Sequence, residues 1–97
     1  MNEPLQHHDF EPHLGKVFRF PGSHLALRLT SIDAADHVPV PGTVRQSFSL
    51  IFQGPAGDIL PEGFYQAEVE DGPVFGFYII PIHTPAHDRQ DYQVVFN

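Results

Sequence analysis

The chain has 97 residues, of which 41% are hydrophobic and 12% aromatic, and its formal net charge is −7 at pH 7. This length predicts one domain, and the composition argues against global disorder. The few lysines and arginines are scattered, which argues against nucleic acid and membrane surfaces as partners, because both need clustered positive charge. The absence of cysteine excludes disulfides, thiol catalysis and zinc–thiolate sites.

The first segment, residues 1–8, is polar and is expected to form a flexible arm of the single domain 1–97. It lacks the basic and apolar regions of a secretory signal, and no apolar run approaches the roughly 20 residues of a membrane span. We therefore expect a soluble protein that is cytoplasmic as synthesised and reaches other locations only as part of a larger particle.

A short helical turn is expected after the arm. Asp9 is a suitable cap for Phe10–Leu14, and Gly15 is a suitable C-terminal stop. A turn of this length is unstable alone, so it requires Phe10 and Leu14 to pack on the rest of the fold.

Two strands are predicted next, at Val17–Phe20 and Leu25–Ile32. The second has leucines at every other position, which is typical of a half-buried strand, although its Leu, Ala and Arg content leaves a helix open. The proline-rich segment Asp33–Thr43 is then expected to be a loop.

The most apolar strand is predicted at Val44–Gln53. Phe48, Leu50 and Phe52 alternate with smaller or polar residues, which places them on one face. Ile51 adds an apolar side chain to the other face, so we expect a central strand that is partly covered on both sides.

Three further strands complete the predicted set. Phe64–Glu70 and Val74–Ile80 flank Asp71-Gly72-Pro73 and are expected to form a hairpin, and Tyr92–Phe96 is the last strand. Ile59 and Leu60 are expected to enter the core between turns. The predicted turns and loops here are Gly54–Asp58, Pro61–Gly63 and Pro81–Asp91.

These elements predict an all-β fold of about six antiparallel strands, in a small barrel or a sandwich, with one short N-terminal helical turn. Closure of the sheet is favoured because exposed edges promote aggregation and the chain has few lysines to protect them. The aromatic residues are expected to form the core, with a ligand-stacking surface as the alternative. They are Phe18, Phe20, Phe64, Tyr65, Phe75, Phe77 and Tyr78.

The seven histidines are the unusual feature of the composition. Candidate metal ligands are His83 and His87, together with Asp88 or with Asp9 and His13. His83 and His87 have the spacing that binds metal when both lie on one helix face, but Pro85 between them argues against a helix. Solvated loop histidines are the favoured interpretation, so no cofactor is predicted.

No catalytic constellation is recognisable. No serine lies in a Gly-x-Ser-x-Gly elbow. The acidic run of Glu68, Glu70 and Asp71 has no calcium-loop spacing and is expected to be a solvated hairpin tip. The sequence therefore favours a protein that is not an enzyme.

Several motifs resemble those of a bacterial family of small β proteins of unknown function. They are Phe10–Gly15, Phe48–Phe52 with Gly54-Pro55, Leu60–Tyr65, Ile80–Ile82 and Tyr92–Asn97. Two aromatics, Phe64 and Tyr65, stand where a single one is usual. Members look like accessory proteins encoded near phage-tail-like or tail-collar-like proteins, and the resemblance implies no catalytic residues.

Together these observations predict a non-enzymatic structural or protein-interaction module, and the resemblance implies an accessory of a phage-tail-like assembly. Association with a partner or with itself is expected through a strand edge or an aromatic patch. The alternative is a small ligand- or metal-binding β-barrel that uses the loop histidines.

Overall fold

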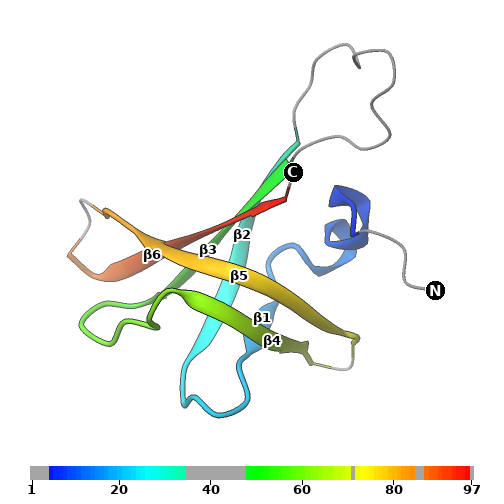
Figure 1. The fold of residues 1–97 in the computed structure, drawn as a ribbon. Coiled ribbons are helices and arrows are strands. Elements are labelled where there is room, and N and C mark those ends of the chain that lie inside the picture. Colours follow the sequence, from blue (N-terminus) through cyan, green and yellow to red (C-terminus); the bar gives the residue numbers. More distant parts are fainter. Residues whose placement is uncertain (1–4, 35–47, 71, 85–86, 97) are drawn as a thin grey trace.

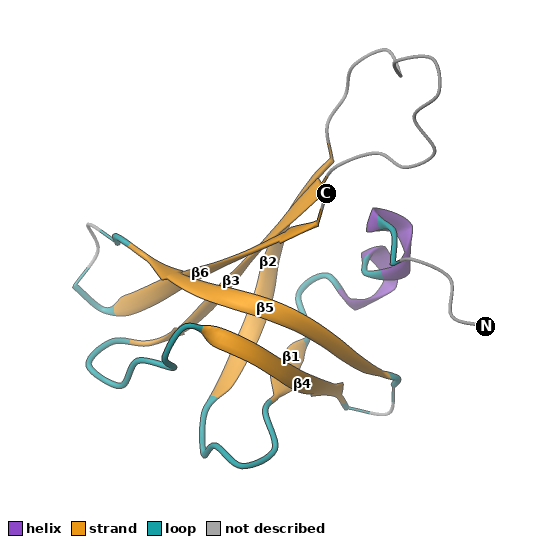
Figure 2. Cartoon of the chain, viewed as in Figure 1, coloured by secondary structure: helices purple, strands orange, loops and turns teal. Residues whose placement is uncertain are grey.

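The computed structural model describes residues 5–34, 48–70, 72–84 and 87–96. In this part of the chain, six antiparallel strands form a closed barrel behind two short 3-10 turns (Figure 1, Figure 2). The turns are η1 (His7–Asp9) and η2 (Glu11–His13), and the strands are β1 (Val17–Arg19), β2 (Ala26–Ala34), β3 (Phe48–Pro55), β4 (Gly63–Val69), β5 (Val74–Ile82) and β6 (Arg89–Phe96). The all-β prediction is confirmed, in the form of a barrel. No helix in the described ranges is long and apolar enough to span a membrane.

The strand order around the barrel is β1-β2-β3-β6-β5-β4. β1 closes the circle by pairing with β4, where Phe18 lies opposite Val69 and Arg19 opposite Glu68. The predicted hairpin of β4 and β5 is confirmed, with Phe64 opposite Tyr78. Closure pairs strands that are remote in sequence, and it reduces the open edges that a flat sheet would expose.

β3 is the central strand that the alternating pattern predicted. It pairs with β2 on one side and with β6 along its whole length on the other. Phe48, Leu50 and Phe52 are buried, whereas Ile51 is half-buried on the outer face. Burial of each large side chain contributes on the order of 2 kcal/mol, so this strand anchors the core.

The core fills the barrel and continues beneath the N-terminal turns. Its buried members are Phe10, Phe18, Phe20, Leu25, Leu27, Leu29, Phe48, Leu50, Phe52, Leu60, Ala67, Val69, Phe75, Phe77, Ile79, Tyr92 and Val94. Two aromatics that the sequence assigned to it, Phe64 and Tyr78, lie instead on the outer surface. The interpretation was wrong for these two because they alternate with inward residues on β4 and β5.

The N-terminal turns complete the barrel wall. β5 and β6 pair only through Ile80–Ile82 and Asp91–Gln93, and they diverge beyond these residues (Figure 1). Phe10 lies in the resulting gap, with its ring centroid 4.5 Å from that of Phe75 on β5 and 5.6 Å from that of Phe96 on β6. The helical turn is therefore held by aromatic packing, as expected for Phe10.

The helical segment begins earlier than predicted. η1 starts at His7, and the Asp9 carboxylate reaches back to accept a hydrogen bond from the N–H of Gln6 at 2.8 Å. Leu5 packs against the core, so the arm predicted over 1–8 overlaps this packed segment, while residues 1–4 lie outside the described residues. Leu14, which was expected to pack, is exposed. The predicted stop is present, because Gly15 has a φ of 86°.

Two predicted loop boundaries were wrong because polar and turn-forming residues continue the strands. Gly54 and Pro55 belong to β3 and pair with β6. β5 continues through Pro81 to Ile82, and β6 begins at Arg89. Side chains stabilise this end of the hairpin, because Thr84 Oγ1 accepts from the N–H of Asp91 and the Gln90 amide donates to the Ile82 carbonyl.

The segment between β2 and β3 differs from its prediction at one end. β2 extends to Ala34, so Asp33 lies in a strand and not in the predicted loop. Residues 35–47, which include the rest of that loop and the predicted start of the central strand, lie outside the described residues.

Candidate functional site

The outer surface of the β4–β5 hairpin carries the candidate site. Alternation places Phe64, Gln66 and Glu68 of β4 on this surface, beside Val74, Gly76 and Tyr78 of β5. Three large apolar or aromatic side chains are strongly exposed here, with 65% of Phe64, 55% of Val74 and 47% of Tyr78 accessible. We call these three residues, with Gly76 between them, the hairpin patch.

Cross-strand pairing assembles the hairpin patch. Phe64 lies directly opposite Tyr78, and Val74 lies opposite Glu68. A methyl group on Gly76 would come within 3.0 Å of Cζ of Phe64, so the ring already lies over the β5 backbone at the glycine. An aromatic ring in this position shields the glycine backbone from solvent, and the contact restricts the movement of the ring. The patch is therefore a continuous surface.

A hydrogen bond fixes the second aromatic ring. The Tyr78 hydroxyl donates to the Glu62 carboxylate at 2.5 Å. This hydrogen bond is the main cause that raises the pKa of Tyr78, with smaller effects of burial and of the Glu62 charge. The hydroxyl therefore stays protonated at neutral pH. Its hydrogen bond to Glu62 holds the end of the side chain in place, and the ring presents an apolar face to the surface.

The apolar character continues along β5. Ile80 and Ile82 follow Tyr78 on the same outer face, and both are half-buried. The outer face of β5 thus carries no charged residue, whereas the outer face of β2 carries Arg28, Thr30 and Asp33. An antiparallel strand with one solvated face normally alternates apolar and polar residues, so a second apolar face on β5 calls for an explanation outside the barrel core.

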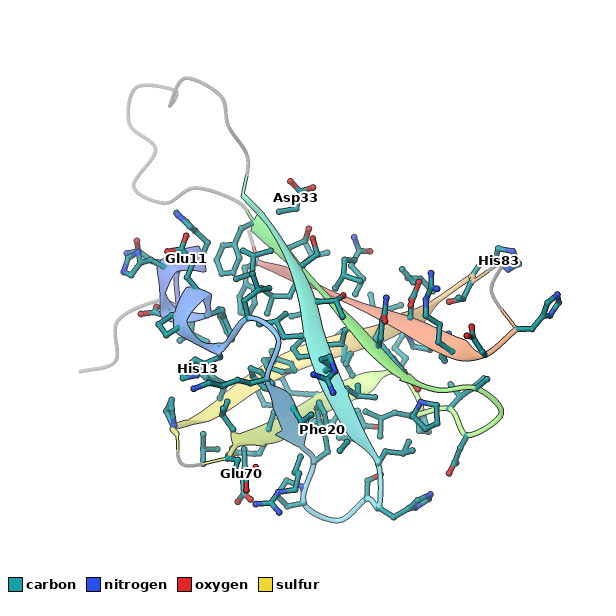
Figure 3. All side chains as sticks on the ribbon, turned by 180° about the vertical axis from the view of Figure 1, so that it is seen from behind. Glu11, His13, Phe20, Asp33, Glu70 and His83 are labelled. Atoms are coloured by element: carbon teal, nitrogen blue, oxygen red, sulfur yellow. The ribbon has the colours of Figure 1, made fainter. Side chains whose placement is uncertain are left out.

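The metal ligands predicted from the sequence are not brought together as a metal site in the described part of the chain. His83, His87 and Asp88 are exposed between β5 and β6. His13 lies on the N-terminal segment, on the other side of the molecule from His83 (Figure 3). Within the described ranges, no three histidine or carboxylate side chains are grouped as a metal site requires. The loop-histidine hypothesis gains no support from this geometry.

One histidine contact was missed by the sequence. His24, between β1 and β2, has its Nε2 2.5 Å from Oδ2 of Asp58, between β3 and β4. Both side chains are largely exposed, so this pair links two loops and contributes little to stability. His24 and Asp58 are far apart in the sequence, and no short motif predicts their contact.

The predicted acidic hairpin tip is confirmed for its described members. Glu68 and Glu70 are exposed, and Figure 3 shows Glu70 at the end of β4; Asp71 lies outside the described residues. The hairpin patch itself could have been suspected from Val74, Tyr78 and Ile80, which give β5 a second apolar face in the sequence. An exposed apolar surface beside carboxylates is chemically suited to binding.

Comparison with known proteins identifies the family. The chain matches the model of a domain of unknown function, DUF6916, over residues 5–96. It therefore belongs to this family, as the resemblance to a family of unknown function implied. No curated protein and no solved structure matches the chain.

Proposed function

We propose that this DUF6916 domain is a non-enzymatic protein-interaction module whose hairpin patch binds a protein partner. The observation that carries the proposal is the exposed pair of Phe64 and Tyr78, which faces outward beside an uncharged strand surface. Aromatic side chains supply large contact area at low conformational cost, and they are enriched at the centres of protein interfaces.

The barrel favours the patch over a strand edge as the docking surface. A partner that adds a strand needs a row of unpaired backbone groups. Each described strand has a partner on both sides for at least part of its length, and Phe10 packs where β5 and β6 diverge, whereas most of the Phe64 ring is exposed. Of the two routes expected from the sequence, the aromatic patch therefore has the stronger support.

The resemblance noted in the sequence suggests the setting. It implies that the domain is an accessory of a phage-tail-like assembly, cytoplasmic as synthesised and incorporated into a larger particle. The hairpin patch fits this setting, because a subunit of a particle needs an apolar surface that its neighbour covers.

Site-specific photo-crosslinking in the native host tests the proposal. A benzoylphenylalanine at position 64 should form an adduct with a protein partner, whereas the same group at Arg28, on the outer face of β2, should not. Phe64→Gln should abolish co-purification of the partner that the adduct identifies, with only a small fall in the unfolding midpoint, because most of the ring is exposed. Equal adducts at both positions, or none at position 64, would refute it.

A further inference from the structure

We infer that the partner presents an aromatic or aliphatic anchor flanked by lysine or arginine. This inference rests on the proposed function, because it concerns the same hairpin patch. It comes from the charged side chains that surround the patch.

Carboxylates stand at both ends of the hairpin patch. Glu62 accepts the hydrogen bond of the Tyr78 hydroxyl at one end, and Glu68 lies opposite Val74 at the other. Glu70 follows at the end of β4 (Figure 3). All three are exposed, and none forms an ion pair with another described residue. Their negative charge is therefore available to a partner.

Few cations oppose this rim. Arg19 on β1 lies opposite Glu68 in the ladder and offsets part of its charge, although the two side chains form no ion pair. The Arg28 guanidinium donates to the carbonyl of Gly15, and Arg89 pairs with Asp91 at 3.0 Å. With a formal net charge of −7 for the whole chain, the field at the patch favours a basic partner.

The same charges disfavour a second copy of the chain as the occupant. A two-fold dimer presents the same patch on both subunits, so the rim carboxylates of one copy would approach those of the other. Like charges at an interface are repulsive, whereas lysine or arginine around an apolar anchor would form charge-assisted hydrogen bonds. A basic, apolar segment of another protein therefore fits this surface better.

A display library of random linear peptides is the probe for this inference. Peptides are selected on the wild-type chain and then measured against three variants at low and high salt. The variants are Phe64→Gln, the rim double variant Glu68→Gln/Glu70→Gln, and the matched control Glu11→Gln/Asp33→Asn. The control neutralises two exposed carboxylates away from the patch, which Figure 3 shows on the N-terminal turn and on β2.

The inference predicts selected peptides with an aromatic or aliphatic residue between lysines or arginines. Their affinity should fall about tenfold in the rim variant, with a smaller difference at high salt, and should not change in the control variant. Peptides that require Phe64 but lack basic residues, or that ignore the rim variant, would overturn the inference and leave the proposed function standing. Peptides whose binding is unaffected by Phe64→Gln would count against the proposed function itself. A wild-type dimer that Phe64→Gln dissociates would identify a second copy of the chain as the occupant of the patch, and it would overturn the inference.

Discussion

The hydroxyl of Tyr92 on β6 accepts a hydrogen bond from the backbone N–H of Leu60 at 2.9 Å, inside the barrel. Both residues are buried, and burial raises the pKa of the Tyr92 hydroxyl. Leu60 lies between β3 and β4, so this hydrogen bond attaches the connection to β6, the strand that pairs with β3. It also explains how Leu60 enters the core while its neighbour Ile59 stays exposed.

Tyr92→Phe should therefore destabilise the barrel. The substitution keeps the ring but leaves the buried N–H of Leu60 without an acceptor, which costs about 1–3 kcal/mol of unfolding free energy. The measurement is urea unfolding, with Tyr65→Phe as the control. The Tyr65 hydroxyl donates to the exposed carbonyl of Pro61, where water can replace it, so we expect a smaller loss. Equal losses in the two variants would contradict this role of Tyr92.

Gly54 allows β3 to pass close to Leu27. A methyl group at Gly54 would overlap with Cδ2 of Leu27 and would lie 3.4 Å from Cε1 of Tyr92. Leu27 is fully buried, so its side chain has no free space to move into. Gly54→Ala should reduce the free energy of unfolding by about 1–3 kcal/mol through overpacking.

A double-mutant cycle checks the origin of that loss. Leu27→Val removes the δ-carbon that the new methyl group would meet, so Gly54→Ala should cost less in the Leu27→Val background. We expect a coupling of about 1 kcal/mol, measured by denaturant unfolding of the four proteins. Strict additivity would show that the contact with Leu27 is not the source of the loss.

Phe10 should be the residue that couples the N-terminal turns to the barrel. It is fully buried among Phe48, Phe75, Phe77 and Phe96, so Phe10→Ala should lower the free energy of unfolding by about 3–5 kcal/mol. Leu14→Ala, at an exposed position four residues later, should change it by less than about 0.5 kcal/mol. A Phe10→Ala loss as small as that of Leu14→Ala would show that the turns are not part of the cooperative fold.

The sequence predicted the strands better than the surfaces they form. Phe48, Leu50 and Phe52 recur at every second position, and this pattern identifies a strand and its buried face although Ile51 lies between two of them. β5 is apolar on both faces, so its pattern cannot show that Phe77 is inside and Tyr78 outside. That choice is made by the register with β4 and by closure of the barrel.

Contacts between distant residues explain what the sequence missed. The loop boundary at Pro81 was wrong because pairing with Tyr92 continues β5 through a residue that usually ends strands. The pairing of Phe18 with Val69, which closes the barrel, has no local signature. The candidate site depends on the same long-range arrangement. Closure of the barrel decides which face of β4 and β5 is buried, and Phe64 and Tyr78 lie on the opposite, exposed face.

His13 should make stability depend on pH. Its ring packs edge-on against Phe18 and Phe75, and its buried Nδ1 has no hydrogen-bond partner among the described residues. Burial, and then the positive charge of Lys16, lower the pKa of His13 below its ordinary value of 6.5. The unfolded chain therefore binds a proton at a higher pH than the folded chain does. This contribution to stability is complete above pH 6.5 and is lost as the pH falls through the lowered pKa.

His13→Phe tests this pH dependence, because it keeps an aromatic ring in contact with Phe18 and Phe75 but cannot bind a proton. Unfolding free energies measured between about pH 7.5 and about pH 5 should fall less steeply in the variant than in the wild type. His83→Gln, which removes an exposed loop histidine, serves as the control and should retain the wild-type slope. If His13→Phe retains the full slope as well, another group is responsible for the loss of stability at acidic pH, and the neutral form of His13 is not required for packing against Phe75.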